Sequence, residues 1–206
     1  ELTDLAPITD AQWKDPDFRN GYKAFERMGG NSEVTEAISA ASDKTGVGVK
    51  DLSVMAAVES GGRADAKNGN FAGLMQMGKQ ATADTGMNWE DVKSDVGANA
   101  EAGAKYWNIN ARQLNKSGYD VNVTNQYLTH QQGFGGFRKM MRTIAKDPEA
   151  KATRNQRVNL PGGYAKSIGK TPSELTQQDF YEYWQSRIGD VEAAYDAHAR
   201  GAKPPK

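Results

Sequence analysis

Three short segments carry the residue types that could perform acid–base chemistry. Glu59 stands at the end of an apolar stretch, directly before Ser60-Gly61-Gly62, and Gly73-Leu74-Met75-Gln76 follows after a short gap. The third segment, residues 127–133, contains His130, one of only two histidines in the chain. A carboxyl group held among such polar residues can donate a proton and take it back. We expect the three segments to converge on one cleft, with Glu59 as its acid.

Other common catalytic signatures are absent from the sequence. The 206 residues contain no cysteine, which excludes a thiol nucleophile, a disulfide framework and a thiolate zinc site. The sequence also lacks the G-x-S-x-G elbow, the phosphate-binding glycine loop and the H-E-x-x-H helix. Two histidines alone cannot build a three-histidine metal centre. We therefore expect neither a metal ion nor an organic cofactor.

The charge balance and the apolar runs limit the partners. The 26 Lys and Arg residues equal the 26 Asp and Glu residues in number, which argues against nucleic-acid binding through bulk electrostatics. The longest apolar runs, such as Val54 to Val58, are too short to cross a bilayer, so we expect no membrane insertion. Residues 1–30 lack a basic start followed by an apolar stretch. We therefore expect delivery by a phage, a secretion system or a longer parent protein.

Glu59 is predicted to end a helix. Val49, Leu52 and Val58 recur at helical spacing, and Gly61-Gly62 stops the pattern. The carbonyl end of a helix carries partial negative charge, which disfavours a carboxylate and raises the pKa of a carboxyl group there. A glutamate on the last turn therefore suits an acid that stays protonated.

The remaining pattern predicts a mainly α domain of about seven helices with one small β-hairpin beside the active-site cleft. We expect residues 1–30, with a short helix at 22–28, to form an extension packed on the domain. Residues 31–200 form the domain itself, and residues 201–206 a frayed tail. The hairpin is expected between residues 68 and 76, and an irregular region at 146–170. The other helices are expected at 31–46, 80–85, 95–117, 123–131 and 137–145, the last two separated by a glycine elbow at 133–136, and from 176 onward.

Four segments together resemble one known family. Glu59-Ser60-Gly61-Gly62 and Gly73-Leu74-Met75-Gln76 resemble the E-S-G and G-L-M-Q signature of the soluble lytic transglycosylase (SLT) and goose-type lysozyme superfamily. Residues 127–136, YLTHQQGFGG, resemble its A-Y-N-A-G-P-G segment and are closer to the phage-endolysin form Y-L-A-H-F-x-G-P-G. Residues 95–107 resemble its D-P-x-x-N-I-x-x-G-A-x-Y-L helix, with four residues in register: Asn99, Gly103, Ala104 and Tyr106.

The resemblance implies a lysozyme-like fold and cleavage of the β-1,4 bond between N-acetylmuramic acid (MurNAc) and N-acetylglucosamine (GlcNAc) in peptidoglycan. It implies that Glu59 acts without a cofactor, first as general acid and then as base, either for the substrate's own C6 hydroxyl, which gives a 1,6-anhydro product, or for a water molecule. The chain departs from the family pattern at three places: His130-Gln131 stands at the Tyr-Asn position, Phe134 replaces the proline, and Gly78-Lys79 replaces Met-Pro. These departures leave the fold expectation intact and put the sugar contacts of that tyrosine in doubt.

The reaction product depends on whether a second carboxylate takes part. A 1,6-anhydro product needs Glu59 alone, whereas hydrolysis with inversion needs a second carboxylate about 6.5–9.5 Å away. Asp65, Asp84, Asp91 and Asp95 are the candidates. Asp65 is preferred because it follows Glu59 on the same loop, and Asp95 is better explained as a helix cap.

Seven further residues are candidate substrate contacts. Each has a structural alternative, because a methionine or an aromatic residue at helical spacing often fills a core and a serine often caps a turn. In the family the serine after the glutamate hydrogen-bonds it, and an amide can both donate to and accept from a sugar hydroxyl. We assign Trp107, Phe180 and Trp184 to the core. The candidates are Ser60, Met75, Gln76, Tyr127, His130, Gln131 and Phe134.

Two further expectations concern partners. Residues 138–157 contain seven basic and two acidic residues, which is typical of a solvated face and could also attract an anionic wall polymer. We expect a monomer with peptidoglycan strands as its partner and an immunity or inhibitor protein as a candidate second partner.

The rival interpretation of the function is a catalytically silent wall-binding or structural module of the same fold.

Overall fold

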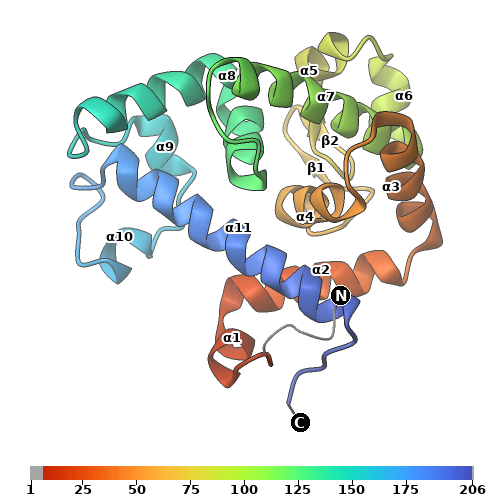
Figure 1. Ribbon diagram of the computed structural model, residues 1–206, viewed down its shortest axis with the longest axis horizontal. Helices are drawn as coiled ribbons and strands as arrows, with labels where there is room; N and C mark the ends of the chain where they lie inside the picture. Colours follow the sequence, from red (N-terminus) through yellow and green to blue (C-terminus); the bar gives the residue numbers. More distant parts are fainter. Residues whose placement is uncertain (1–6, 206) are drawn as a thin grey trace.

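The computed structural model describes residues 7–205, and this part of the chain is mainly helical with one small antiparallel sheet (Figure 1). The predicted fold class is confirmed. None of the helices within residues 7–205 is long and apolar enough to cross a membrane. The elements are α1 Asp10–Lys14, α2 Pro16–Gly29, α3 Ser32–Thr45, α4 Val49–Ser60, β1 Lys67–Asn68, β2 Phe71–Ala72, β3 Met77–Gly78, α5 Lys79–Asp84, α6 Trp89–Ser94, α7 Val96–Lys116, α8 Val123–Lys146, α9 Arg154–Val158, α10 Tyr164–Ser167 and α11 Gln177–Ala199.

Helix α4 is the central element of the fold. It packs against α2, α3, α7, α8 and α11, and all five residues from Leu52 to Ala56 are buried. A helix that is buried on every side needs apolar residues around its whole circumference. Its last turn emerges from this core, so that Glu59 stands where the interior meets solvent.

The main helices begin and end where local signals predict. Asn31 accepts a hydrogen bond from the Val34 amide at the start of α3, and Asp95 accepts one from the Ala98 amide at 2.6 Å at the start of α7. Thr176 caps α11 through a capping box with Asp179. These helices, and the role of Asp95 as a cap, are confirmed.

The predicted hairpin is part of a three-stranded sheet in the order β1-β2-β3. Asn99 of α7 holds it in place. Its Oδ1 accepts from the Met75 amide at 2.8 Å, and its Nδ2 donates to the carbonyls of Ala72 and Val92, both at 2.9 Å. A Cβ atom on Gly73, whose φ is +79°, would lie 2.3 Å from Asn99 Nδ2. Gly73 and Asn99, which both belong to the segments that resemble the family, therefore contact each other, and only glycine fits at position 73.

Several sequence expectations are corrected. Helix α8, Val123–Lys146, consists of two helical segments that meet in a kink at Gly133 (φ 69°, ψ 155°), so the predicted break between two helices is confirmed, but it is confined to Gly133 and does not extend over 133–136. The region 146–170 is not wholly irregular, because α9 and α10 lie in it. Helix α6 was not predicted, and the short helix expected at 22–28 belongs to the 14-residue α2.

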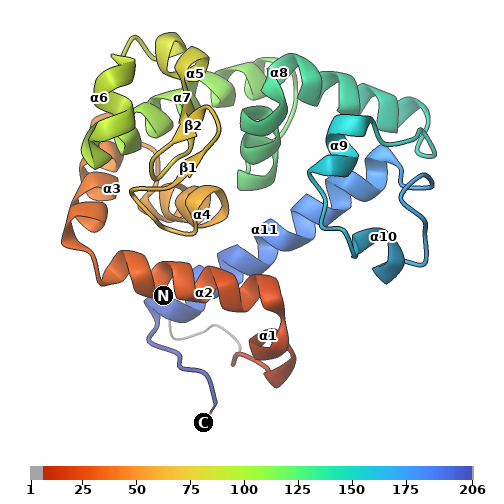
Figure 2. The same ribbon diagram turned by 180° about the vertical axis from the view of Figure 1, so that it is seen from behind.

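Helix α2 and helix α11 share one core although they lie at opposite ends of the chain. They pack side by side (Figure 2), with Phe18 fully buried. At Gly21 the helices approach so closely that a Cβ atom would meet Val191 and Ala194 at 3.3 Å. The Tyr22 hydroxyl donates to the Ala202 carbonyl at 2.5 Å, which ties the start of the expected tail to α2. Residues after Ala202 continue without regular structure to position 205.

Candidate active site

The turn after Glu59 is built to end α4 sharply. The Ser60 hydroxyl donates to the Ala56 carbonyl at 2.9 Å and accepts from the Arg63 amide at 3.2 Å. Gly62 has φ +73°, and a Cβ atom there would lie 2.7 Å from Met28 Cγ. A side chain at that position would therefore push α2 away. Ser60 is buried, and its hydroxyl is hydrogen-bonded within this turn.

The Glu59 carboxyl is enclosed by protein, and 14% of its side chain remains exposed. Burial raises its pKa to about 8, and the positive charge of Arg187 acts in the opposite direction. The negative end of the α4 dipole favours the neutral form in the same sense as burial. A pKa of about 8 keeps the Glu59 carboxyl protonated at neutral pH, and part of the side chain remains open to solvent.

His130 of α8 faces Glu59. Its Nδ1 lies 3.8 Å from Glu59 Oε1, and its ring meets the Tyr106 ring edge-on at 5.5 Å. Burial lowers the pKa of His130 to about 4, against the smaller opposing effect of a backbone hydrogen bond with Gln76. Because burial favours the neutral form of both partners, the pair is a protonated carboxyl beside a neutral imidazole and not an ion pair at neutral pH.

The neighbouring turn of α8 brings Tyr127 and Gln131 to the same place. Gln131 Nε2 donates to the Tyr127 hydroxyl at 3.2 Å, and the Tyr127 ring packs on Trp184 at 4.5 Å. Burial raises the pKa of Tyr127, and the charge of Glu59 raises it further, so the phenol lies within the field of the carboxyl. Trp184 is buried, as the sequence predicts.

Met75 and Gln76 support the hairpin loop. Met75 is buried, and its side chain fills the space that Gly103 leaves open, where a Cβ atom would lie 2.5 Å from Met75 Cγ. Gln76 Nε2 donates to the carbonyls of Ala66 at 3.1 Å and Gly73 at 2.9 Å. The structure thus places Met75 in the core and uses the Gln76 amide nitrogen to hold the loop. The positive φ of Gln76, 45°, marks the same tight loop.

Phe134 and Asp65 lie nearer the surface. Phe134 follows the Gly133 kink, is half-buried, and has the Arg138 guanidinium 5.8 Å from its ring centre. Asp65 is exposed and lines an open cavity of about 1710 Å³. Tyr106 lines this cavity too, whereas Glu59 is not among its lining residues. The cavity therefore flanks the Glu59–His130 pair, and the two meet at Tyr106. Asp84 and Asp95 also line it.

Sequence reasoning missed Arg187 of α11. Its Nε lies 3.6 Å from Asp17 Oδ1, and its guanidinium stands 5.0 Å from the Trp184 ring centre. Its charge acts on both Glu59 and Tyr127. No local motif marks this arginine, because only the packing of α2 and α11 around α4 brings it near the site.

We predict that Arg187→Gln raises the pKa of Glu59, because it removes a positive charge that favours the carboxylate. The alkaline limb of the pH–rate profile should therefore move to higher pH. Arg187→Lys, which keeps the charge, and Arg19→Gln on the exposed side of α2 should leave the limb in place. An unchanged limb in Arg187→Gln would show that the arginine serves packing alone.

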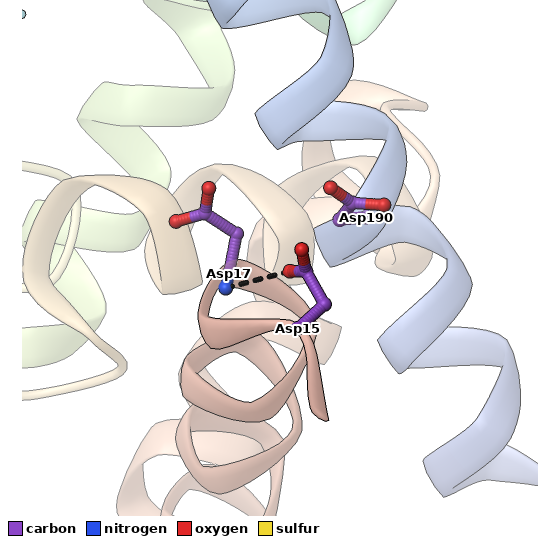
Figure 3. Close-up of side chains that lie close together, drawn as sticks. All are labelled: Asp15, Asp17 and Asp190. Atoms are coloured by element: carbon purple, nitrogen blue, oxygen red, sulfur yellow. Dashed lines mark hydrogen bonds between the residues drawn. The ribbon is translucent and has the colours of Figure 1, made fainter. Parts of the chain in front are cut away.

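Three carboxylates meet between α2 and α11: Asp15, Asp17 and Asp190, with their oxygens within 4.8 Å of one another (Figure 3). Asp15 is the N-cap of α2 and accepts from the amides of Asp17 at 2.8 Å and Phe18 at 2.9 Å. Burial raises the pKa of Asp190 to about 6, and the charges of Asp15 and Asp17 add to this. The three carboxylates are explained without a bound ion: Asp15 caps α2, the N-terminal end of the α2 dipole favours negative charge, and Arg187 lies beside Asp17.

The Asp190 pKa has a consequence for stability. The pKa of Asp190 is about 6 in the folded protein and 3.8 in the unfolded chain, so the folded state binds this proton more tightly. The resulting contribution to the free energy of unfolding is fully present below pH 4 and is lost as the pH rises through 6. Asp190→Asn should therefore raise the free energy of unfolding at pH 8 by about 1 kcal/mol, after allowance for partial exposure, and change it little below pH 4. Urea unfolding at both pH values checks this, with the exposed Asp120→Asn as control. Equal stability of Asp190→Asn and wild type at pH 8 would contradict it.

Comparison with known families agrees with this geometry. Residues 36–152 match the family model described as the transglycosylase SLT domain. The match covers more than half of the chain and includes Glu59, the hairpin, Asn99 and His130. The chain belongs to this family of peptidoglycan-lytic glycosidases. No curated protein matches the chain. Asp17 and Arg187 lie outside the matched residues.

Proposed function

We propose that the protein cleaves the MurNAc-β-1,4-GlcNAc bond of peptidoglycan, with Glu59 as the single general acid and base. The observation that carries the proposal is the Glu59 carboxyl on the last turn of α4, with its pKa raised to about 8 by burial and His130 Nδ1 at 3.8 Å. An acid that must protonate a departing sugar oxygen at neutral pH needs such a pKa.

The reaction runs in two proton transfers. Glu59 gives its proton to the glycosidic oxygen as the bond from that oxygen to C1 of MurNAc breaks, leaving an oxocarbenium-like sugar. The resulting carboxylate then takes the proton of the C6 hydroxyl, whose oxygen bonds to C1 and gives a 1,6-anhydro end. The neutral His130 imidazole is a polar neighbour of the carboxyl and does not form an ion pair with it.

We favour this non-hydrolytic outcome over hydrolysis. Hydrolysis with inversion requires a second carboxylate that activates water, and Asp65, the preferred candidate, lies exposed at the flanking cavity. Tyr127, His130, Gln131 and Phe134 are the proposed substrate contacts. All four belong to α8, His130 lies beside Glu59 at 3.8 Å, and Gln131 is hydrogen-bonded to Tyr127.

Mass spectrometry of glycan fragments released from purified peptidoglycan tests the proposal. Anhydro-muramic ends would support the transglycosylase reaction, and Asp65→Asn should then leave the rate unchanged. Reducing muramic ends together with a loss of rate in Asp65→Asn would establish the muramidase alternative. Ends at GlcNAc, or cleavage of peptide bonds only, would contradict the proposed bond.

The setting is part of the same proposal. We place the protein in the bacterial cell wall as a monomeric endolysin or secreted effector, delivered by a phage, a secretion system or a longer parent protein. An immunity or inhibitor protein is its candidate partner. The rival is a silent wall-binding module, and a buried, protonated glutamate speaks against it, because a module that only binds has no need to keep an uncompensated carboxyl in its core.

A further inference from the structure

The second half of α8 carries a basic face made of Arg138, Lys139, Arg142 and Lys146. These four side chains line one surface hollow of about 280 Å³ together with Gly135 and Thr143. Positions four residues apart lie on the same side of a helix, which explains why the side chains converge there. The hollow is thus lined by four cations in a chain whose net charge is zero.

The charges of the basic face are not neutralised within the protein. Helix α8 contains no Asp or Glu over its whole length. Within residues 7–205 none of the four side chains takes part in an ion pair, although Asp147 and Glu149 follow the helix directly.

Helix stability does not account for this arrangement. Like charges four residues apart destabilise a helix. The helix dipole favours cations only in the last turn, which covers Lys146 and leaves Arg138 and Arg142 unexplained. A face that costs stability and lacks internal partners is suited to an external anion.

The basic face follows the candidate active-site residues of α8 along the chain. It shares α8 with His130, and the Arg138 guanidinium lies over the Phe134 ring, just past the Gly133 kink. His130 and Arg138 are eight residues apart on two helical segments that meet at Gly133. At about 1.5 Å per helical residue and about 3.3 Å for the extended Gly133, the backbone path between them is about 14 Å. An extended tetrapeptide reaches about 14 Å. A peptide attached to a sugar held at Glu59 can therefore span the distance to the basic face.

We propose that the basic face binds the carboxylates of the peptide stems of peptidoglycan and so selects peptide-bearing strands. This proposal rests on the proposed function for its substrate and adds the part of the substrate that the sugar site does not contact. Arginine and lysine pair with carboxylates through charge-assisted hydrogen bonds, which arginine makes in bidentate form.

Co-sedimentation with purified sacculi tests it, in a Glu59→Gln background so that the sacculi stay intact. The basic-face variant carries Arg138→Gln, Arg142→Gln and Lys146→Gln. The control variant loses the same charge elsewhere, through Lys23→Gln, Arg112→Gln and Lys116→Gln, all at exposed positions. Each protein is also mixed with sacculi whose carboxyl groups have been converted to neutral amides with carbodiimide and ethanolamine. Unchanged thermal melts confirm that the variants fold.

The basic-face variant should bind native sacculi about tenfold more weakly than the control at low salt, and its binding should depend less on salt. Amidation of the sacculi should weaken the binding of the Glu59→Gln protein by the same factor. It should leave the binding of the basic-face variant unchanged. Equal binding by the two charge variants would overturn the proposal. The proposal would also be overturned if the basic-face variant still bound more weakly than the control variant on amidated sacculi. It would likewise be overturned if this difference disappeared only when phosphate polymers were removed from the wall.

The same variants separate this proposal from the proposed function. With Glu59 restored, both charge variants should cleave amidated sacculi at the wild-type rate. If wild type releases no glycan ends from either kind of sacculi, the proposed function fails, and the binding experiment still decides whether the basic face recognises carboxylates.

Discussion

Replacing Glu59 with glutamine should slow the release of glycan fragments from peptidoglycan by about 10³-fold, because the amide keeps the shape of the side chain and has no proton to give. The residual rate would come from binding and orientation alone. The fold should survive, since the substitution removes a carboxyl that burial already disfavours in its charged form. Glu59→Gln should in fact be more stable than wild type above pH 8, where wild type has to ionise a buried carboxyl.

Dye release from labelled sacculi measures the rate. Glu26→Gln, the same exchange at an exposed position of α2, is the matched control and should retain full activity. A Glu59→Gln variant that is folded and cleaves at more than about a tenth of the wild-type rate would remove Glu59 from the role of general acid.

Asn99→Ala should lower the free energy of unfolding by about 3 kcal/mol, the largest stability effect that we predict. From the first turn of α7 the buried side chain makes three hydrogen bonds, to the Met75 amide and to the carbonyls of Ala72 and Val92. Alanine makes none of them and leaves these backbone groups without partners in a buried place. Because two of the three partners belong to the hairpin, the loop beside Glu59 should loosen and activity should fall as well.

Urea unfolding compares this variant with Asn108→Ala on the same helix. Asn108 Nδ2 makes one partly buried hydrogen bond, to the Thr45 carbonyl at 2.9 Å, and its loss should cost about 1 kcal/mol. If Asn99→Ala were no more destabilised than Asn108→Ala, the anchoring of the hairpin by Asn99 would be refuted.

The parts of the fold that depend on short-range signals could be predicted from the sequence. Asn31, Asp95 and Thr176 cap their helices with their own side chains, and Gly61 ends α4 two residues after Glu59. Such signals act within one helical turn, so they can be recognised without knowledge of the rest of the chain.

Local signals predicted the elbow in α8 at the right place, Gly133, but made it too long. Glycine costs a helix only about 1 kcal/mol per residue, so two of them can be accommodated if the turn that follows is well packed. Phe137 and Met140 are buried directly after the kink and hold Gly135 and Gly136 in helical geometry. The predicted four-residue break rested only on the low helix propensity of glycine. It did not include the packing of Phe137 and Met140, which depends on the tertiary structure.

The candidate site was predictable only in part. Glu59 and His130 stand in motifs, and the structure brings them together. Whether a polar side chain points at substrate or back into its own loop depends on hydrogen bonds that form only in the folded chain, as at Ser60 and Gln76. Arg187 had no local signal at all, because its position results from the packing of helices from the two ends of the chain.

The measurement that tests the account most directly is a titration of the Glu59 carboxyl by NMR, with ¹³C-labelled glutamate and Glu59→Gln to assign the signal. The account predicts a midpoint near pH 8, with the carboxyl protonated at neutral pH beside a neutral His130. A midpoint near the ordinary value of 4.5 would mean that Glu59 is ionised at neutral pH and cannot serve as the acid that starts the reaction.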